Sequence, residues 1–89
     1  LIQRAHAVGA KVLIDCCQTI GHERIDVEKL GVDFVVFSGH KMLGPEGVGI
    51  LFIKSSIQHE VVPYQYGGGM VFDASFDTTT WLKSPHCYE

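Results

Sequence analysis

The sequence predicts an α/β fold built around a mostly parallel sheet, and three observations carry this prediction. Short helical patterns alternate with strand patterns along the first two thirds of the chain. The strand patterns are near-continuous apolar runs, which are typical of strands covered on both faces by other elements. Apolar residues make up 46% of the 89 residues and charged residues 19%, which is the balance of a chain with a packed core.

The elements of the first half can be justified in order. Residues 1–8 carry apolar side chains at helical spacing, and Gly9 is suited to end that helix. The run Lys11–Asp15 (KVLID) predicts a short buried strand that ends in a carboxylate. Asp26 is placed to cap a brief helix that ends at Gly31.

Two further apolar runs, Asp33–Phe37 and Val48–Ile53, predict a second and a third buried strand. Too few residues join these runs for a crossover helix, so the two strands are either antiparallel or joined by an irregular excursion. Ser55 is expected to cap a short helix that extends to His59. The segment after Gly67 is rich in glycine, threonine and aromatic residues, and this composition predicts a bulged hairpin.

Charge and cysteine content argue against several classes of function. The net charge is −3 and the basic residues are scattered, so no nucleic-acid partner is expected. No apolar run approaches the roughly 20 residues of a membrane span, and no signal peptide is visible. The five histidines and three cysteines show no metal-ligand spacing, so no metal is expected.

The cysteines also bear on the compartment. Cys16, Cys17 and Cys87 do not form an even disulfide framework, which favours a reducing compartment such as the cytoplasm, or an organelle stroma or matrix. Cys16 and Cys17 are expected to pack as small apolar side chains. His6 is expected to be an ordinary helix residue without a special role.

Reactive side chains follow two of the predicted strands. The first strand ends in Asp15, and the second is followed by Ser38, Gly39, His40 and Lys41. If the two strands are parallel and adjacent, these side chains meet at one edge of the sheet, where α/β proteins gather their ligands. A lysine, a carboxylate and an anion-binding loop suit an aldehyde cofactor that bears a phosphate.

Two nucleotide-binding motifs fit the glycine-rich segment poorly. Gly44–Leu51 (GPEGVGIL) lacks the Gly-Lys-[Ser/Thr] ending of a P-loop. The segment also fails as a Gly-x-Gly-x-x-Gly dinucleotide fingerprint, because Phe52 stands where the third glycine would be.

The sequence from Gly9 to Lys54 resembles the cofactor-binding core of the class V aminotransferase family, pyridoxal-phosphate enzymes of fold type I. Three motifs carry the resemblance in combination: Asp-x-x-Gln at 15–18, Ser-Gly-His-Lys at 38–41 and Gly-Pro-x-Gly-x-Gly at 44–49. Within the family the sequence is most similar to the SufS-like cysteine desulfurases. The resemblance implies that residues 1–89 are an excerpt of the large, mostly parallel-sheet, cofactor-binding domain of a longer chain.

The resemblance implies roles for five residues. Lys41 would be the catalytic lysine that holds pyridoxal 5′-phosphate as a Schiff base, and Asp15 would pair with the protonated pyridine nitrogen. Gln18 would hydrogen-bond the phenolic oxygen of the ring, and Ser38 and His40 would contact the phosphate. The family's stacking histidine would precede this sequence, and its persulfide cysteine and substrate-binding arginine would follow it.

The implied activity is removal of sulfur from L-cysteine, which gives alanine and an enzyme persulfide for iron–sulfur cluster assembly. The resemblance further implies a homodimer that acts on L-cysteine or a related amino acid and passes sulfur to an acceptor protein, with no membrane partner. The alternatives left open are a selenocysteine lyase, another class V transaminase or lyase, and an inactive fragment. The 89 residues alone are expected to show no turnover.

Overall fold

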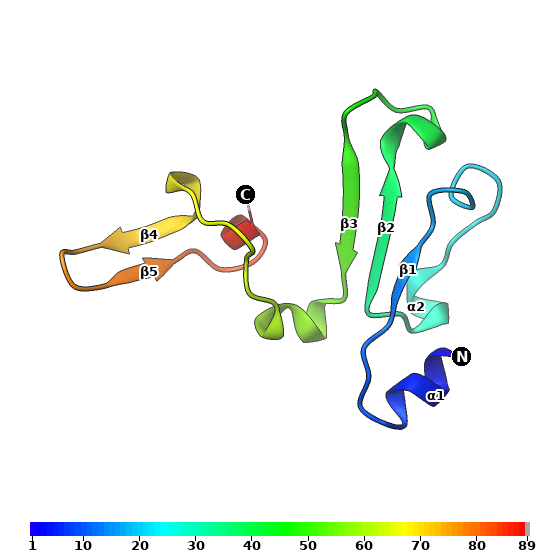
Figure 1. The fold of residues 1–89 in the computed structure, drawn as a ribbon, viewed down its shortest axis with the longest axis horizontal. Coiled ribbons are helices and arrows are strands. Elements are labelled where there is room, and N and C mark those ends of the chain that lie inside the picture. The colour runs from blue at the N-terminus through cyan, green and yellow to red at the C-terminus, as the bar shows by residue number, and fades with distance from the viewer. Residues whose placement is uncertain (89) are drawn as a thin grey trace. The chain divides into compact units, whose positions relative to one another are not determined.

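The computed structural model describes residues 1–88, which divide into two compact units. The first unit spans Leu1–Ser55, and the second begins at Ser56. The first unit contains the sheet of β1, β2 and β3, and the second contains the hairpin of β4 and β5 (Figure 1). All five predicted site residues lie in the first unit.

The described elements of the first unit are, in chain order, α1 (Ile2–His6), β1 (Leu13–Asp15), α2 (Val27–Leu30), β2 (Phe34–Ser38), the 3-10 helix η1 (Gly39–Met42) and β3 (Gly49–Ile53). The strand order in the sheet is β1-β2-β3. β1 runs parallel to β2, with Asp15 opposite Val36. β3 runs antiparallel to β2, with Gly49 opposite Ser38, which decides between the two connections that the sequence left open.

Local sequence features explain both ends of α2. The Asp26 side chain accepts a hydrogen bond from the backbone N–H of Lys29 at 3.0 Å, which caps the helix N-terminus. Gly31 follows with a φ of 67°, a left-handed conformation that glycine adopts without steric cost. Both predicted caps are therefore confirmed. The first helix is shorter than predicted. α1 ends at His6, and Gly9 closes the turn that follows.

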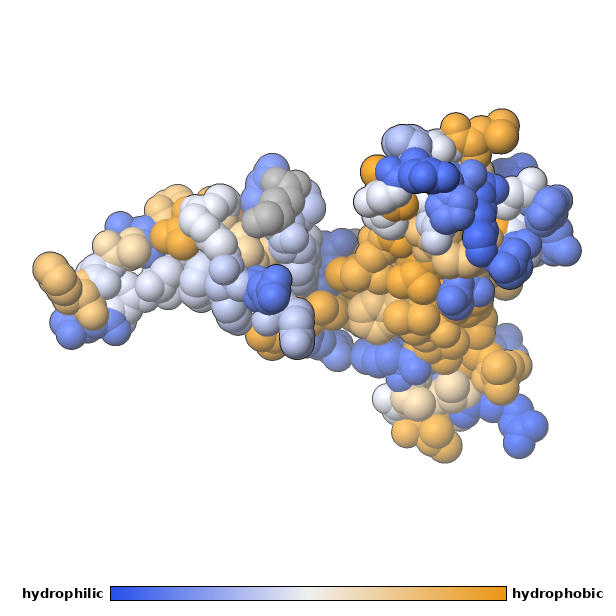
Figure 2. Space-filling model, turned by 45° about the horizontal axis from the view of Figure 1, so that its top comes forward, coloured by the Kyte–Doolittle hydropathy of each residue, from blue (hydrophilic) through white to orange (hydrophobic). Residues whose placement is uncertain are grey.

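The core of the first unit lies on one face of its sheet. Cys16, Val32 and Val35 are buried there, and partly buried apolar residues pack against them: Ile2, Val12, Ile14, Ile20, Ile25, Val27, Phe37 and Phe52. Leu13 and Leu51, which the register places on the opposite face, are 56% and 54% exposed. Figure 2 shows hydrophobic side chains gathered on the surface of this unit. Within residues 1–88, the second face of the sheet is therefore not covered by other elements.

A buried carboxylate joins α1 to the start of β2. Asp33 is 3% exposed; its Oδ2 lies 2.7 Å from His6 Nε2 and accepts a hydrogen bond from the backbone N–H of Val12 at 2.8 Å. These two bonds, that of His6 first, hold the pKa of the Asp33 carboxyl below its ordinary value. His6 thus makes a structural contact that the sequence did not reveal. Because Asp33 takes the Val12 N–H, the strand begins at Leu13 and not at Lys11.

Asp33→Ala in the full-length protein is expected to lower the free energy of unfolding by roughly 1–3 kcal/mol, since it leaves the partly buried N–H of Val12 without its acceptor. The folded-state pKa is lowered, so this stabilisation is fully present above the ordinary value of 3.8 and is lost as the pH falls through the folded-state pKa. Urea unfolding at several pH values measures both effects. Asp77→Ala, in the exposed turn between β4 and β5, is the control, and a matching midpoint for the two variants would contradict the prediction.

The second unit contains the predicted bulged hairpin. Its described elements are the 3-10 helices η2 (Ser55–Glu60, beginning at the unit boundary) and η3 (Gly68–Met70), the strands β4 (Val71–Ala74) and β5 (Thr79–Trp81), and the 3-10 helix η4 (His86–Tyr88). β4 and β5 are antiparallel, and their register shifts between Val71 and Asp73, which confirms the bulge. Within residues 1–88, no helix has the length and apolar character that crossing a membrane requires.

Candidate functional site

The structure brings four of the predicted site residues to one edge of the sheet in the first unit. β1 and β2 are parallel, and their arrows point toward the same edge (Figure 1). Asp15 is the last residue of β1, and Ser38 is the last residue of β2. His40 and Lys41 follow directly in η1. This edge is where α/β sheets offer their ligand-binding crevice.

The strand register also places Asp15 and Ser38 on the same face of the sheet. Side chains alternate between the two faces along a strand, and Asp15 lies opposite Val36. Val36 and Ser38 are two residues apart, so all three side chains project from one face. The core residue Val35 projects from the other face. The carboxylate and the hydroxyl therefore point away from the core, toward the side from which a ligand can approach.

Hydrogen bonding keeps the carboxylate of Asp15 charged. Its Oδ1 accepts a hydrogen bond from the backbone N–H of Cys17 at 2.9 Å, and this bond is the main reason that the pKa of Asp15 is lowered. The Cys17 side chain lowers this pKa further, and desolvation raises it by less than either contact with Cys17 lowers it. Lys41, which belongs to a different element, makes the smallest contribution to this shift in pKa.

The fifth predicted residue, Gln18, lies in the turn that follows β1. The backbone N–H groups of Thr19 and Ile20 both donate to the carbonyl of Cys16 at 2.9 Å, which closes this turn at the end of the strand. Gln18 is exposed, as are His40 and Lys41, while Ser38 is half-buried. Among residues 1–88, no three His, Cys, Asp or Glu side chains are grouped so that they could hold a metal ion.

Close backbone packing fixes the loop that carries Lys41. A Cβ atom at Gly21 would overlap the backbone carbonyl oxygen of Lys41, so the present chain path accepts only glycine there. A Cβ atom at Gly44 would lie 2.8 Å from the carbonyl oxygen of Gly39, which accepts a hydrogen bond from the Gly44 N–H at 2.9 Å. The motif at 44–49 drew attention to Gly44. Gly21 was missed because its contact becomes visible only once the turn after β1 is folded against η1.

Gly21→Ala is expected to displace the Lys41 backbone and to lower the free energy of unfolding by about 1–3 kcal/mol, the usual cost of an added methyl group in a packed region. The matched control is Gly49→Ala. A Cβ atom at Gly49 would meet nothing within 4 Å, and this glycine does not have a left-handed φ. Urea unfolding of the two full-length variants tests the difference, and an equal loss of stability in both would show that the contact with Lys41 is not the cause.

Cys17 is a site residue that the sequence did not reveal. Its Sγ lies 3.4 Å from the Oγ of Ser38, so the expectation that it packs as a small apolar side chain is wrong. The same expectation is confirmed for Cys16, which is 2% exposed in the core, where burial raises the pKa of its thiol. The contact between Cys17 and Ser38 spans 21 residues and depends on the parallel register of β1 and β2.

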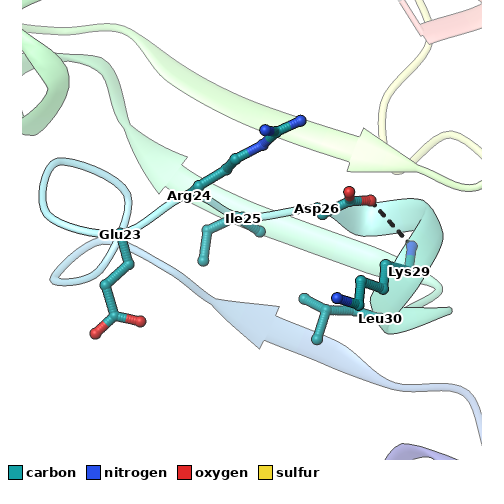
Figure 3. A pocket seen from close by; sticks show the side chains of 6 residues that line it. All are labelled: Glu23, Arg24, Ile25, Asp26, Lys29 and Leu30. Atoms are coloured by element: carbon teal, nitrogen blue, oxygen red, sulfur yellow. Dashed lines mark hydrogen bonds between the residues drawn. The ribbon is translucent and has the colours of Figure 1, made fainter.

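An open hollow in the first unit lies apart from these residues (Figure 3). Its lining consists of Glu23, Arg24, Ile25, Asp26, Lys29 and Leu30. The side chains of Glu23 and Arg24 point away from one another (Figure 3), and the carboxylate of Asp26 is engaged in capping α2. The hollow therefore offers no converging set of reactive groups, in contrast to the edge formed by β1 and β2.

Comparison with known proteins identifies relatives along the whole chain. The profile of the family described as Aminotransferase class-V matches residues 1–89. The chain is 46% identical over 90 residues to the cysteine desulfurase of Escherichia coli (strain K12 / DH10B), and the match covers 100% of this chain and 22% of that protein. The chain thus spans 22% of the length of this curated relative.

Solved structures agree with the sequence comparison. The crystal structure of the cysteine desulfurase CsdA (S-sulfonic acid) from Escherichia coli matches with a TM-score of 0.92 and 41% identity, over 99% of this chain and 22% of that chain. The apo structure of a cysteine desulfurase from Thermococcus onnurineus NA1 matches with a TM-score of 0.89 and 36% identity, over 98% of this chain and 22% of that chain.

Proposed function

Because the chain belongs to the class-V aminotransferase family, we propose that it provides cofactor-binding and catalytic residues of a pyridoxal-phosphate-dependent cysteine desulfurase. The proposed reaction removes sulfur from L-cysteine and yields alanine and an enzyme persulfide. One observation carries the proposal: the parallel strands β1 and β2 bring Asp15 to the same edge of the sheet as Ser38, His40 and Lys41. The 46% identity to a cysteine desulfurase supports the choice of this activity within the family.

The groups at this edge suit pyridoxal 5′-phosphate. Lys41 would hold the aldehyde carbon through its Nζ, and Asp15 would pair with the protonated ring nitrogen. Gln18 would bind the phenolic oxygen, and Ser38 and His40 would donate hydrogen bonds to the phosphate. This role requires a charged carboxylate, which stabilises a protonated ring nitrogen, and the lowered pKa of Asp15 is consistent with it.

When bound, pyridoxal phosphate supplies an electron sink, since its protonated ring withdraws electrons from the α-carbon of an attached amino acid. The residues of this chain do the remaining work. Asp15 holds the proton on the ring nitrogen, because its carboxylate stays ionised at neutral pH. The Nζ of Lys41 takes the proton from the α-carbon of the substrate as a general base. Ser38 and His40 keep the phosphate in place, so that the reacting carbon stays within reach of Lys41.

The proposal also covers the sulfur acceptor, the oligomeric state and the compartment of the enzyme. The sulfur would be taken up by a cysteine elsewhere in the full-length protein and passed to an acceptor protein for iron–sulfur cluster assembly. We infer that the enzyme is a homodimer in the cytoplasm or in an organelle stroma or matrix. The three cysteines of the described residues, Cys16, Cys17 and Cys87, are free thiols, which suits a reducing compartment.

The test uses the full-length protein. We expect an absorbance band of the bound cofactor that disappears on reduction with borohydride, and peptide mapping should then find the cofactor attached to Lys41. L-Cysteine added together with a thiol reductant, which supplies the two electrons that reduce the persulfide sulfur, should give alanine and sulfide in equal amounts. A cofactor attached to a different lysine would contradict the site. A preference for L-selenocysteine, or formation of an oxo acid in place of sulfide, would retain the site and replace the proposed substrate with one of the family alternatives.

A further inference from the structure

The thiol of Cys17 lies beside the hydroxyl that is proposed to hold the phosphate. Cys17 Sγ is 3.4 Å from Ser38 Oγ, and the backbone N–H of Cys17 donates to Asp15 Oδ1 at 2.9 Å. One residue thus contacts a group proposed for the phosphate and a group proposed for the ring nitrogen. Its neighbour Cys16 belongs to the core, so the two adjacent cysteines have separate surroundings.

The chemistry of the two groups determines which of them donates when a phosphate is bound. A serine hydroxyl has one proton and two acceptor lone pairs, whereas a phosphate ester at neutral pH offers mainly acceptor oxygens. Ser38 must therefore spend its only proton on the phosphate. Its contact with Cys17 is then satisfied only if the thiol is the donor, from Sγ–H to Oγ. A thiol is a weak donor, so the expected effect is one of orientation.

We propose that Cys17 is a positioning residue, whose thiol donates to Ser38 Oγ and turns the Ser38 hydroxyl toward the phosphate of the cofactor. This inference rests on the proposed function. It assigns Cys17 neither contact with the substrate nor a part in sulfur transfer. It predicts that Cys17 affects the recognition of the phosphate more strongly than the recognition of the ring, which the contact of Cys17 with Asp15 also influences.

Pyridoxal 5′-phosphate and pyridoxal separate these contributions, because both have the ring and the aldehyde and only one has the phosphate. The experiment titrates each compound into the cofactor-free, full-length protein and follows absorbance. Cys17→Ala is expected to weaken binding of pyridoxal 5′-phosphate by roughly 2- to 10-fold, the effect of one modest hydrogen bond, and to weaken binding of pyridoxal by a smaller factor. Cys17→Ser should restore the affinity, since a hydroxyl can donate in the same place.

A double-mutant cycle links the effect to Ser38. In a Ser38→Ala background, Cys17→Ala should weaken binding of pyridoxal 5′-phosphate no more than it weakens binding of pyridoxal, because the hydroxyl that Cys17 orients is gone. Cys87→Ala, which removes a thiol from the second unit, is the control and should change neither affinity. Circular dichroism of each variant checks that the fold is retained.

The outcomes separate this inference from the function on which it rests. Equal weakening of both compounds by Cys17→Ala, additive losses in the double variant, or no change at all would overturn the role of Cys17 and leave the proposed function standing. If the wild-type protein binds pyridoxal 5′-phosphate no better than pyridoxal, the phosphate site is wrong and both proposals fail.

Discussion

Replacing Lys41 with alanine in the full-length protein is expected to lower sulfide release from L-cysteine by roughly 10³-fold or more. Lys41 is proposed both to hold the cofactor and to take the proton from the substrate, so its loss removes two functions at once. Its position supports these roles, since it follows β2 directly in η1 and its charge reaches Asp15 at the end of β1. Cofactor added in excess should bind to the variant without becoming fixed by borohydride.

The matched control for this prediction is Lys29→Ala. Lys29 is an exposed lysine of the same unit, and the substitution keeps its backbone N–H, which is the group that Asp26 caps. Turnover of this variant should equal that of the wild type. The role of Lys41 would be refuted by a Lys41→Ala variant that keeps more than roughly a tenth of the wild-type rate, because a lost general base alone costs more than this.

The second large effect is expected for Asp15→Asn, which should lower kcat by roughly 10²- to 10⁴-fold. Asparagine has nearly the same shape, and its side-chain oxygen can still accept the hydrogen bond from the Cys17 N–H. The variant therefore removes the charge and keeps the local fold. Without the charge, the ring nitrogen of the cofactor loses its proton and the ring withdraws electrons less strongly.

Two measurements check the role of Asp15. Steady-state kinetics with L-cysteine should show the loss in kcat, while urea unfolding should show little change in stability. Asp77→Asn, at an exposed aspartate of the hairpin turn, should leave both unchanged. The pKa of Asp15 is lowered from 3.8, so the wild-type enzyme should keep this charge at every pH above that value. Normal turnover by Asp15→Asn would rule out the proposed partner of the ring nitrogen.

The part of the fold that depends on local sequence could be predicted. The caps of α2 need only Asp26 and Gly31, and the bulged hairpin follows from the composition after Gly67. The location of Asp15 and Ser38 at the same edge of the sheet could also be predicted. Strands that flank a crossover are parallel, so their ends share an edge.

The features that escaped prediction depend on contacts between distant parts of the chain. The bond between His6 and Asp33 joins residues 27 positions apart, and no periodic pattern marks either one as a partner of the other. The contact of Cys17 with Ser38 has the same origin, since it exists only in the observed strand register. The exposed strand face of Leu13 was also missed, because an apolar run alone does not show how much of the sheet is covered.

The distance between Asp33 and Ser38 determines whether substitutions near these two residues influence one another. Asp33 precedes β2 and Ser38 ends it, so the strand separates them by roughly 16 Å at the usual rise per residue. Effects of substitutions that far apart generally add without interaction. Substitutions around Asp33 are therefore expected to change the stability of the first unit independently of substitutions at Ser38.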